Sequence, residues 1–226
     1  MYSEITIHNP NITFEELSIQ VKTIYKHAKY TSRSVPKPFI KAIEEELLYA
    51  KTNFEAKYDY FITQNFELDQ YLYINNAKFF IGTELTSLLR FSDRMALFIC
   101  TAGETISIRN RELISTGLML EAYANDIIGN LIVERIADFV FDIIKKEHNN
   151  VTNRYSPGNC GWDKLNQKAF FSLFQNINSG VSINDAQMMT PVKSLNGIIG
   201  IGEKVTFRHN TCKYCSSSGC LYRKQK

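Results

Sequence analysis

An unbroken helical pattern of apolar residues from Gly117 to His148 constrains the fold of this chain more than any other feature of its sequence. Apolar side chains recur there every three or four residues, at Leu120, Ala124, Ile127, Ile128, Leu131, Ile132, Ile136, Phe139, Val140 and Ile143. This apolar face is broad, which is typical of a helix that is buried on much of its circumference. We therefore expect one long central helix, with the remaining elements packed around it.

The chain is predicted to begin with a shorter helix over residues 13–28. Thr13 and Glu16 have the spacing of a capping box, and Ile12 and Leu17 have that of a hydrophobic staple. Both motifs are typical of the start of a helix, and apolar residues follow at helical spacing.

The other segments mix helix and strand patterns. A second helix after the prolines at 36 and 38 would turn Glu44–Glu46 toward water, and the aromatic stretch 56–82 predicts two or three short antiparallel strands. Further along we expect helices at 83–89, 104–115 and 169–174, and strands at 94–101, directly after Asn150, and at 197–201. Because these elements lack regular βαβ alternation, the predicted fold class is α+β, with a central antiparallel sheet flanked by helices.

Length and charge narrow the class of protein. The 226 residues fit one large domain or two small ones, at roughly 100–200 residues per domain. There are 26 Lys and Arg against 23 Asp and Glu, and this net charge of +3 is too balanced for a dedicated nucleic-acid binder. No apolar run approaches the roughly 18 residues of a membrane span, and Met1–Glu4 lacks the order of a secretion signal. We expect a cytoplasmic protein with neither nucleic acid nor a membrane as partner.

The cysteines are unevenly placed. Cys100 and Cys160 stand alone, whereas Cys212, Cys215 and Cys220 crowd the end of the chain. Five cysteines without a signal sequence favour a metal site, redox chemistry or incidental thiols over a disulfide framework. Basic residues also collect in this terminal segment, so residues 204–226 form a chemically distinct, basic and cysteine-rich tail.

The segment from Asn153 to Trp162 holds an Arg, two Gly, a Pro, a Cys and the only Trp of the chain. Pro157-Gly158 predicts a turn with a positive φ at the glycine, and Gly161 permits a close backbone approach to a ligand. Arg154, just before the turn, offers a planar fork of donors that suits a carboxylate or a phosphate. The alternative is an ordinary surface turn with a salt-bridged arginine.

This segment resembles the Arg-x-x-x-Gly motif in the activation (reactivation) domain of vitamin B12-dependent methionine synthase, and especially the short, stand-alone members of that family. Three other segments resemble the family in the same order: 96–103, the long helix through 124–138, and 187–197. The likeness covers roughly residues 35–226. It implies a C-shaped α+β domain with a bent antiparallel sheet. The implied organisation is an N-terminal helical extension (1–34), an activation-like domain (35–203) and the tail (204–226).

The resemblance also implies a ligand and its contacts. The family binds S-adenosylmethionine, and one electron together with this methyl donor restores methylcobalamin from cob(II)alamin. Carried onto this chain, Arg154 would bind the ligand's carboxylate, Glu134 its ammonium group, and the backbone of 156–158 its adenine. The implied ligand set is Glu134, Arg154, Tyr155, Ser156, Pro157, Gly158 and Asn159. Read without the resemblance, Glu134 would be a solvated residue or a partner of Arg135 or Asp138.

In one position the chain departs from the family, which usually has Tyr where this chain has Asn159. A tyrosine can cover a ligand with its ring and anchor it with its hydroxyl, whereas asparagine offers only an amide. This difference favours an alternative in which the small-molecule site is lost.

The tail cysteines Cys212, Cys215 and Cys220 have spacings that one metal ion or cluster could accept. Cys160 is the best candidate for a fourth ligand, and His209 is the second. Either an iron–sulfur cluster or zinc would suit these thiolates, and unligated thiols are the alternative.

Taken together, these features predict a component of cobalamin-dependent methionine synthase (methyltransferase) activity rather than a stand-alone enzyme. It would bind S-adenosylmethionine and support reductive methylation of cob(II)alamin in trans. Its partners would be a cobalamin-binding methionine synthase or another corrinoid protein, and an electron-donor protein. The alternatives are a non-catalytic module that binds a corrinoid protein, and an iron–sulfur-dependent corrinoid activator.

Overall fold

The computed structural model describes residues 12–174 and 179–209. Its helical elements are η1 (Glu15–Leu17), α1 (Val21–His27), α2 (Lys37–Thr52), α3 (Gly82–Leu89), α4 (Thr105–Ser115), α5 (Met119–His148), η2 (Lys164–Asn166) and α6 (Gln167–Ser172). Its strands are β1 (Lys57–Thr63), β2 (Phe66–Leu68), β3 (Tyr71–Ile74), β4 (Ala77–Phe80), β5 (Arg94–Thr101), β6 (Val151–Tyr155), β7 (Ser182–Ile183), β8 (Met189–Thr190) and β9 (Ser194–Ile201).

Four of the strands form the main sheet, in the order β1-β5-β9-β6, and every neighbouring pair is antiparallel. A second sheet joins β2, β3 and β4, and β7 pairs with β8. The stretch expected to hold two or three strands therefore contains four. One of them, β1, belongs to the main sheet.

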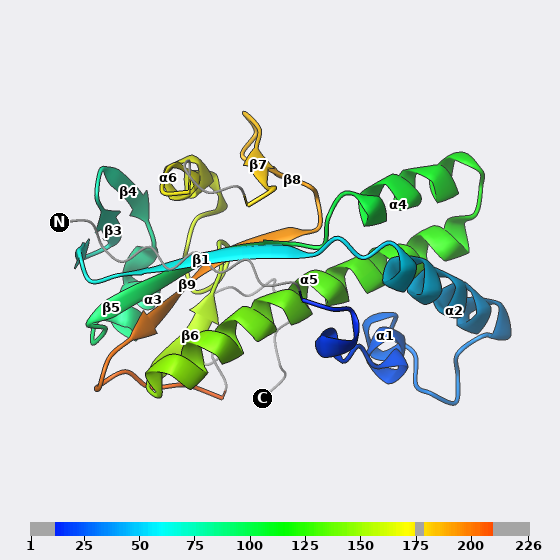
Figure 1. Cartoon of the computed structure of the whole chain (residues 1–226), viewed down its shortest axis with the longest axis horizontal. Coiled ribbons are helices and arrows are strands. Elements are labelled where there is room, and N and C mark those ends of the chain that lie inside the picture. Colours follow the sequence, from blue (N-terminus) through cyan, green and yellow to red (C-terminus); the bar gives the residue numbers. More distant parts are fainter. Residues whose placement is uncertain (1–11, 175–178, 210–226) are drawn as a thin grey trace.

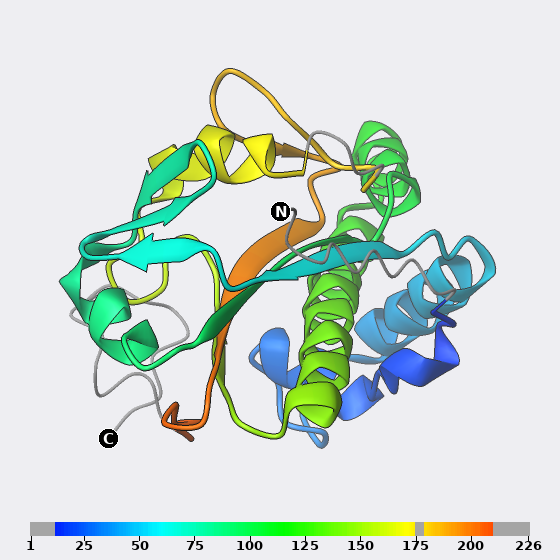
Figure 2. The ribbon, with the colours of Figure 1, turned by 60° about the vertical axis from the view of Figure 1, so that its left-hand side comes forward.

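The main sheet is covered on both faces, and successive side chains of β5 enter different cores. Ala96, Phe98 and Cys100 pack with α5, α2 and α1, whereas Met95, Leu97 and Ile99 pack with β3, β4 and α3. This alternation is the period of two expected for a strand between two layers. Figure 1 shows α5 running diagonally along one face of the sheet, and Figure 2 shows the smaller sheet and α6 on the other side.

Helix α5 is the spine that the apolar periodicity predicted. Its 30 residues give it a length of about 45 Å, and most of its apolar positions are buried against the sheet, α2 and α4. It ends at Asn149, which has a positive φ of 47°. The predicted α+β class, with an antiparallel sheet flanked by helices and one long central helix, is confirmed. Among the described residues, no helix has the length and apolar character that crossing a bilayer requires.

The predicted helix over 13–28 is wrong as a single element. The capping box does form, since Thr13 N donates to Glu16 Oε2 at 2.7 Å. However, Ser18 has a left-handed backbone (φ 48°), so only the short turn η1 follows the box and α1 starts afresh at Val21. Leu17 and Ile24 are buried in the same core as α5, and this packing favours the break over a continuous helix.

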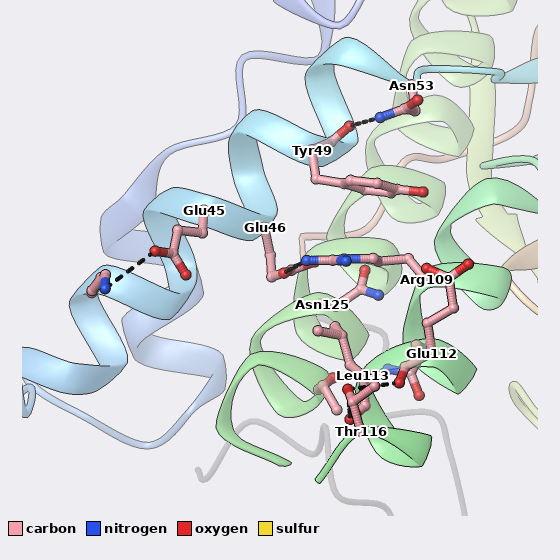
Figure 3. A network of polar contacts seen from close by, with 12 residues as sticks. Glu45, Glu46, Tyr49, Asn53, Arg109, Glu112, Leu113, Thr116 and Asn125 are labelled. Atoms are coloured by element: carbon pink, nitrogen blue, oxygen red, sulfur yellow. Dashed lines mark hydrogen bonds and ion pairs between the residues drawn. The ribbon is translucent and has the colours of Figure 1, made fainter. Parts of the chain in front are cut away.

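The expectation that Glu44–Glu46 all face water is also wrong. The Glu46 side chain is 0% exposed, and both of its oxygens accept hydrogen bonds from Arg109 of α4, at 2.8 and 3.1 Å. The Arg109 guanidinium lies over the ring of Tyr49, 4.8 Å from its centre, so α2 and α4 are joined by charge and by a cation–π contact (Figure 3). The hydrogen bonds and the charge of Glu46 raise the pKa of Arg109.

Replacing Arg109 by Met should destabilise the protein by about 3–5 kcal/mol, because the Glu46 carboxylate would stay buried without a partner. Urea unfolding followed by circular dichroism measures this loss. Lys51→Met is a matched control, since Lys51 pairs with Glu15 in a contact exposed on both sides, and should change stability little. Adding Glu46→Met to Arg109→Met should recover much of the loss. Equal effects of Arg109→Met and Lys51→Met would contradict the assignment.

Asp59 is a second buried acid, and it forms no ion pair with any of the residues that the structure describes. It lies on β1, is 2% exposed, and its Oδ2 has no hydrogen-bond partner among the described residues. Burial raises the pKa of Asp59 above its usual 3.8, and Lys57 opposes this effect. The folded protein therefore holds a proton on Asp59 at pH values where the unfolded chain has lost it.

This raised pKa makes Asp59 a source of instability that grows as the pH rises from about 3.8 through the folded-state pKa. Asp59→Asn should therefore stabilise the protein at pH 7, and its advantage over the wild type should shrink toward pH 4. Urea unfolding of both proteins at a series of pH values checks this. A difference in stability that does not change with pH would contradict the prediction.

Candidate functional site

The face that α5 presents to β6 carries two acids one helical turn apart. Glu134 and Asp138 are four residues apart, so they lie on the same side of the helix. On β6, Arg154 is in register with Ile199, whose side chain packs in the core on the α5 side of the sheet. The guanidinium of Arg154 therefore faces the helix, and it meets both acids.

Arg154 pairs with both carboxylates. Its Nη2 donates to Glu134 Oε2 at 2.5 Å and lies 3.0 Å from Asp138 Oδ1, and its Nε donates to Asp138 Oδ1 at 3.1 Å. The Arg154 side chain is 22% exposed, and about half of each acid is exposed. Burial alone would lower the pKa of Arg154, but the charges and hydrogen bonds of Glu134 and Asp138 raise it. Arg154 therefore stays a cation across the working pH range of a protein.

The turn after β6 has the geometry that Pro157-Gly158 predicts. Gly158 has a φ of 94°, and Asn159 N donates to Ser156 O at 2.9 Å to close the turn. The amide oxygen of Asn159 accepts from Ser156 N at 3.0 Å, so this side chain stabilises the turn itself. The side chain of Lys164 runs across the turn, against the open side of Gly158.

A cavity of about 920 Å³ extends from the Arg154 ion pair. Its wall draws residues from five parts of the chain: Thr23 and His27; Asn130, Leu131, Val133, Glu134, Arg135 and Asp138; Arg154, Ser156, Pro157 and Asn159; Lys164 and Gln167; and Met189 with 192–196. Five residues of the expected ligand set therefore lie on one cavity: Glu134, Arg154, Ser156, Pro157 and Asn159.

The other two members of the expected set, Tyr155 and Gly158, are not on the cavity wall. Tyr155 alternates with Arg154 along β6, so its ring is buried in the opposite core, and this burial raises the pKa of its hydroxyl. Tyr155 could contribute only through its backbone.

The predicted metal ligands are not brought together by the described residues. Cys160 is buried in the core with Trp162, and no group of three or more His, Cys, Asp or Glu in the described ranges could hold a metal ion. Cys212, Cys215 and Cys220 lie outside the described residues. The metal site stays a prediction from sequence.

Sequence reasoning missed Lys193, which fixes the segment leading into β9 against α5. Its Nζ donates to Asp126 at 2.6 Å and to Asn130 at 2.7 Å. The side chain crosses α5 at Gly129, where an added Cβ would come within 3.2 Å of it. The sequence could have suggested that another element approaches α5 closely at Gly129. It could not have identified Lys193 as the side chain that does so.

Asp138, Gln167 and Asn196 were also missed as candidate site residues. Asp138 could have been found, because it follows Glu134 at helical spacing. Gln167 and Asn196 carry no sequence signal. Asn196 reaches the cavity because β6 pairs with Ile198–Ile201 and leaves the first four residues of β9 with a neighbour on one side only, and Gln167 reaches it from the start of α6.

No protein-family model and no curated protein matches this sequence. Among solved structures, the chain is similar to the crystal structure of the MetH reactivation domain bound to AdoHcy, with a TM-score of 0.68. The two are 10% identical, and the match covers 90% of this chain and 81% of that chain. At this identity the likeness establishes the fold, and the fold is that of the MetH reactivation domain.

Proposed function

We propose that this chain binds S-adenosylmethionine and serves as the reactivation component of a cobalamin-dependent methionine synthase, supporting reductive methylation of cob(II)alamin in trans. The observation that carries the proposal is the placement of Arg154 and Glu134 side by side on one cavity. The fold adds support, because the similar MetH reactivation domain was solved with AdoHcy bound.

The donor set fits the amino-acid end of such a ligand. An amino-acid zwitterion needs a cation for its carboxylate and an anion for its ammonium group, and charge-assisted hydrogen bonds to both are strong. Arg154 uses Nε and Nη2 for its two acids, so Nη1 is left over among the described contacts. The cavity of about 920 Å³ lies within the range of small-molecule sites, roughly 300–1,000 Å³.

Arg154 can bind a ligand without losing its orientation because two acids, Glu134 and Asp138, hold its guanidinium group. When Glu134 turns to a ligand's ammonium group, Asp138 still holds Arg154 through Nε and Nη2. The arginine then keeps its orientation while its remaining N–H groups receive a carboxylate. Binding therefore exchanges one ion pair for two and leaves no buried charge unpaired.

Bound S-adenosylmethionine would supply the methyl group, and the protein would supply position and electrostatics. Arg154 and Glu134 would fix the amino-acid end, and Pro157, Lys164 and α1 line other parts of the same cavity. Methyl transfer between two cofactors needs no general acid or base from this chain. The cobalt would come with a partner protein, and the electron with a donor protein.

Calorimetry with S-adenosylmethionine and S-adenosylhomocysteine tests the proposal. The wild type should show saturable binding. Arg154→Ala and Glu134→Gln should each weaken it by about 10–100-fold, because each removes a charge-assisted contact. Arg111→Ala serves as the control, since Arg111 is an exposed arginine of α4 that is absent from the cavity wall.

Thermal melting accompanies these titrations, because a folded Arg154→Ala variant is needed for the comparison. A folded wild type that binds neither compound would exclude the proposal and favour a corrinoid-protein interaction module. Asn159 favours that alternative, because its amide oxygen accepts a hydrogen bond from Ser156 N within the turn and offers no ring to a ligand. A cobalamin-carrying methionine synthase in the cob(II)alamin state, given a reductant and S-adenosylmethionine, should regain activity with the wild type and not with Arg154→Ala.

A further inference from the structure

Three side chains on the cavity wall carry a buried polar atom that has no hydrogen-bond partner among the described residues: Asn196 Nδ2, Gln167 Oε1 and Ser156 Oγ. Asn196 is 1% exposed and Gln167 is 9% exposed. Buried polar groups in folded proteins are nearly always hydrogen-bonded, and those that are not require an explanation. Three of them on one wall leave polar atoms with which a molecule that enters the cavity can form hydrogen bonds.

Asn196 lies across the sheet edge from the ion pair. Side chains alternate along β9, and Ile199, opposite Arg154, packs on the α5 side, whereas Ile198 packs on the other. Asn196, two residues before Ile198, therefore lies on the face away from α5. A ligand held by Arg154 and Glu134 on the α5 side reaches Asn196 by crossing the free edge of β9.

The three groups differ in what they offer. Gln167 Nε2 donates to Gln187 O at 3.3 Å, and this contact leaves Gln167 Oε1 as an acceptor. Asn196 Nδ2 has no hydrogen-bond partner among the described residues, and the same amide carries an acceptor, Oδ1, beside this donor. The Ser156 hydroxyl can do either. These three groups are therefore polar and uncharged, unlike the Arg154 end.

We infer that Asn196 reads the base of the ligand, with Gln167 Oε1 and Ser156 Oγ completing a polar subsite for adenine. Adenine presents an amino donor next to a ring-nitrogen acceptor, and an asparagine amide matches this pair with two hydrogen bonds. The inference rests on the proposed function and deepens it. It gives the ligand a direction, with its amino-acid end at α5 and its base beyond the edge of β9.

The test compares S-adenosylhomocysteine with its hypoxanthine analogue, in which an oxygen replaces the amino group of the base. The wild type should bind the adenine compound about tenfold or more tightly, as measured by calorimetry. Asn196→Leu, which keeps the branched shape of the side chain and removes the amide, should weaken adenine binding by a similar factor and bind both compounds equally. Asn196→Ala should behave in the same way and serves if the leucine variant folds poorly.

Melting temperature without ligand separates this role from a structural one. Asn196→Leu removes a buried amide without partners, so the free protein should melt at the same temperature or higher. Asn110→Leu is the matched control: Asn110 Nδ2 donates to Ala122 O at 2.8 Å, away from the cavity wall. That variant should melt lower and keep the full preference for adenine.

Each outcome has one consequence. A wild type that binds neither compound overturns the proposed function and the adenine subsite together. A wild type that binds both compounds equally overturns the subsite and leaves the proposed function standing. An Asn196→Leu variant that keeps the preference, or that melts well below the wild type, also overturns the role of Asn196.

Discussion

Burial of α5 against the main sheet is the constraint on which the site depends. A helix of 30 residues that packs on the sheet, α2 and α4 has little freedom to rotate, because turning it would expose the apolar residues that fill the core. Its polar positions are fixed with it. Glu134 and Asp138 emerge beside β6, and Asp126 and Asn130 emerge beside Lys193. One helix thus sets the positions of Glu134 and Asp138 on the cavity wall and of the groups that hold Lys193.

The same constraint explains why the Arg154 cluster can be both stable and open to a ligand. Arg154 alternates with Tyr155 on β6, and the tyrosine ring is buried in the opposite core, so the strand cannot slip without losing that packing. The backbone of Arg154 is held in β6, and its guanidinium group is held by the carboxylates of Glu134 and Asp138. Because both acids are half exposed, water can replace one contact at small cost while the other remains.

Local patterns in the sequence predicted most helices and strands, but they could not predict the contacts between distant segments. Period and composition were sufficient for α5 and β5, whereas the capping box at Thr13 could not reveal that Ser18 interrupts the helix. Glu46 sits in a run of acids that resembles a solvated face, and its partner Arg109 is 63 residues away. Arg154 and Glu134 were paired through the resemblance, and Asn196 depends on where β6 stops, which no local pattern encodes.

The segment before residue 35 belongs to the site as much as to the core. Asn159 stabilises its own turn and leaves no ring to cover a ligand, but Thr23 and His27 of α1 lie on the same cavity. Ile24, between them, is buried in the core that holds α5. Alternate sides of one short helix therefore serve packing and the cavity. Helix α1 is therefore part of the cavity wall as well as part of the core, so a chain that lacks the N-terminal extension would lack this part of the wall.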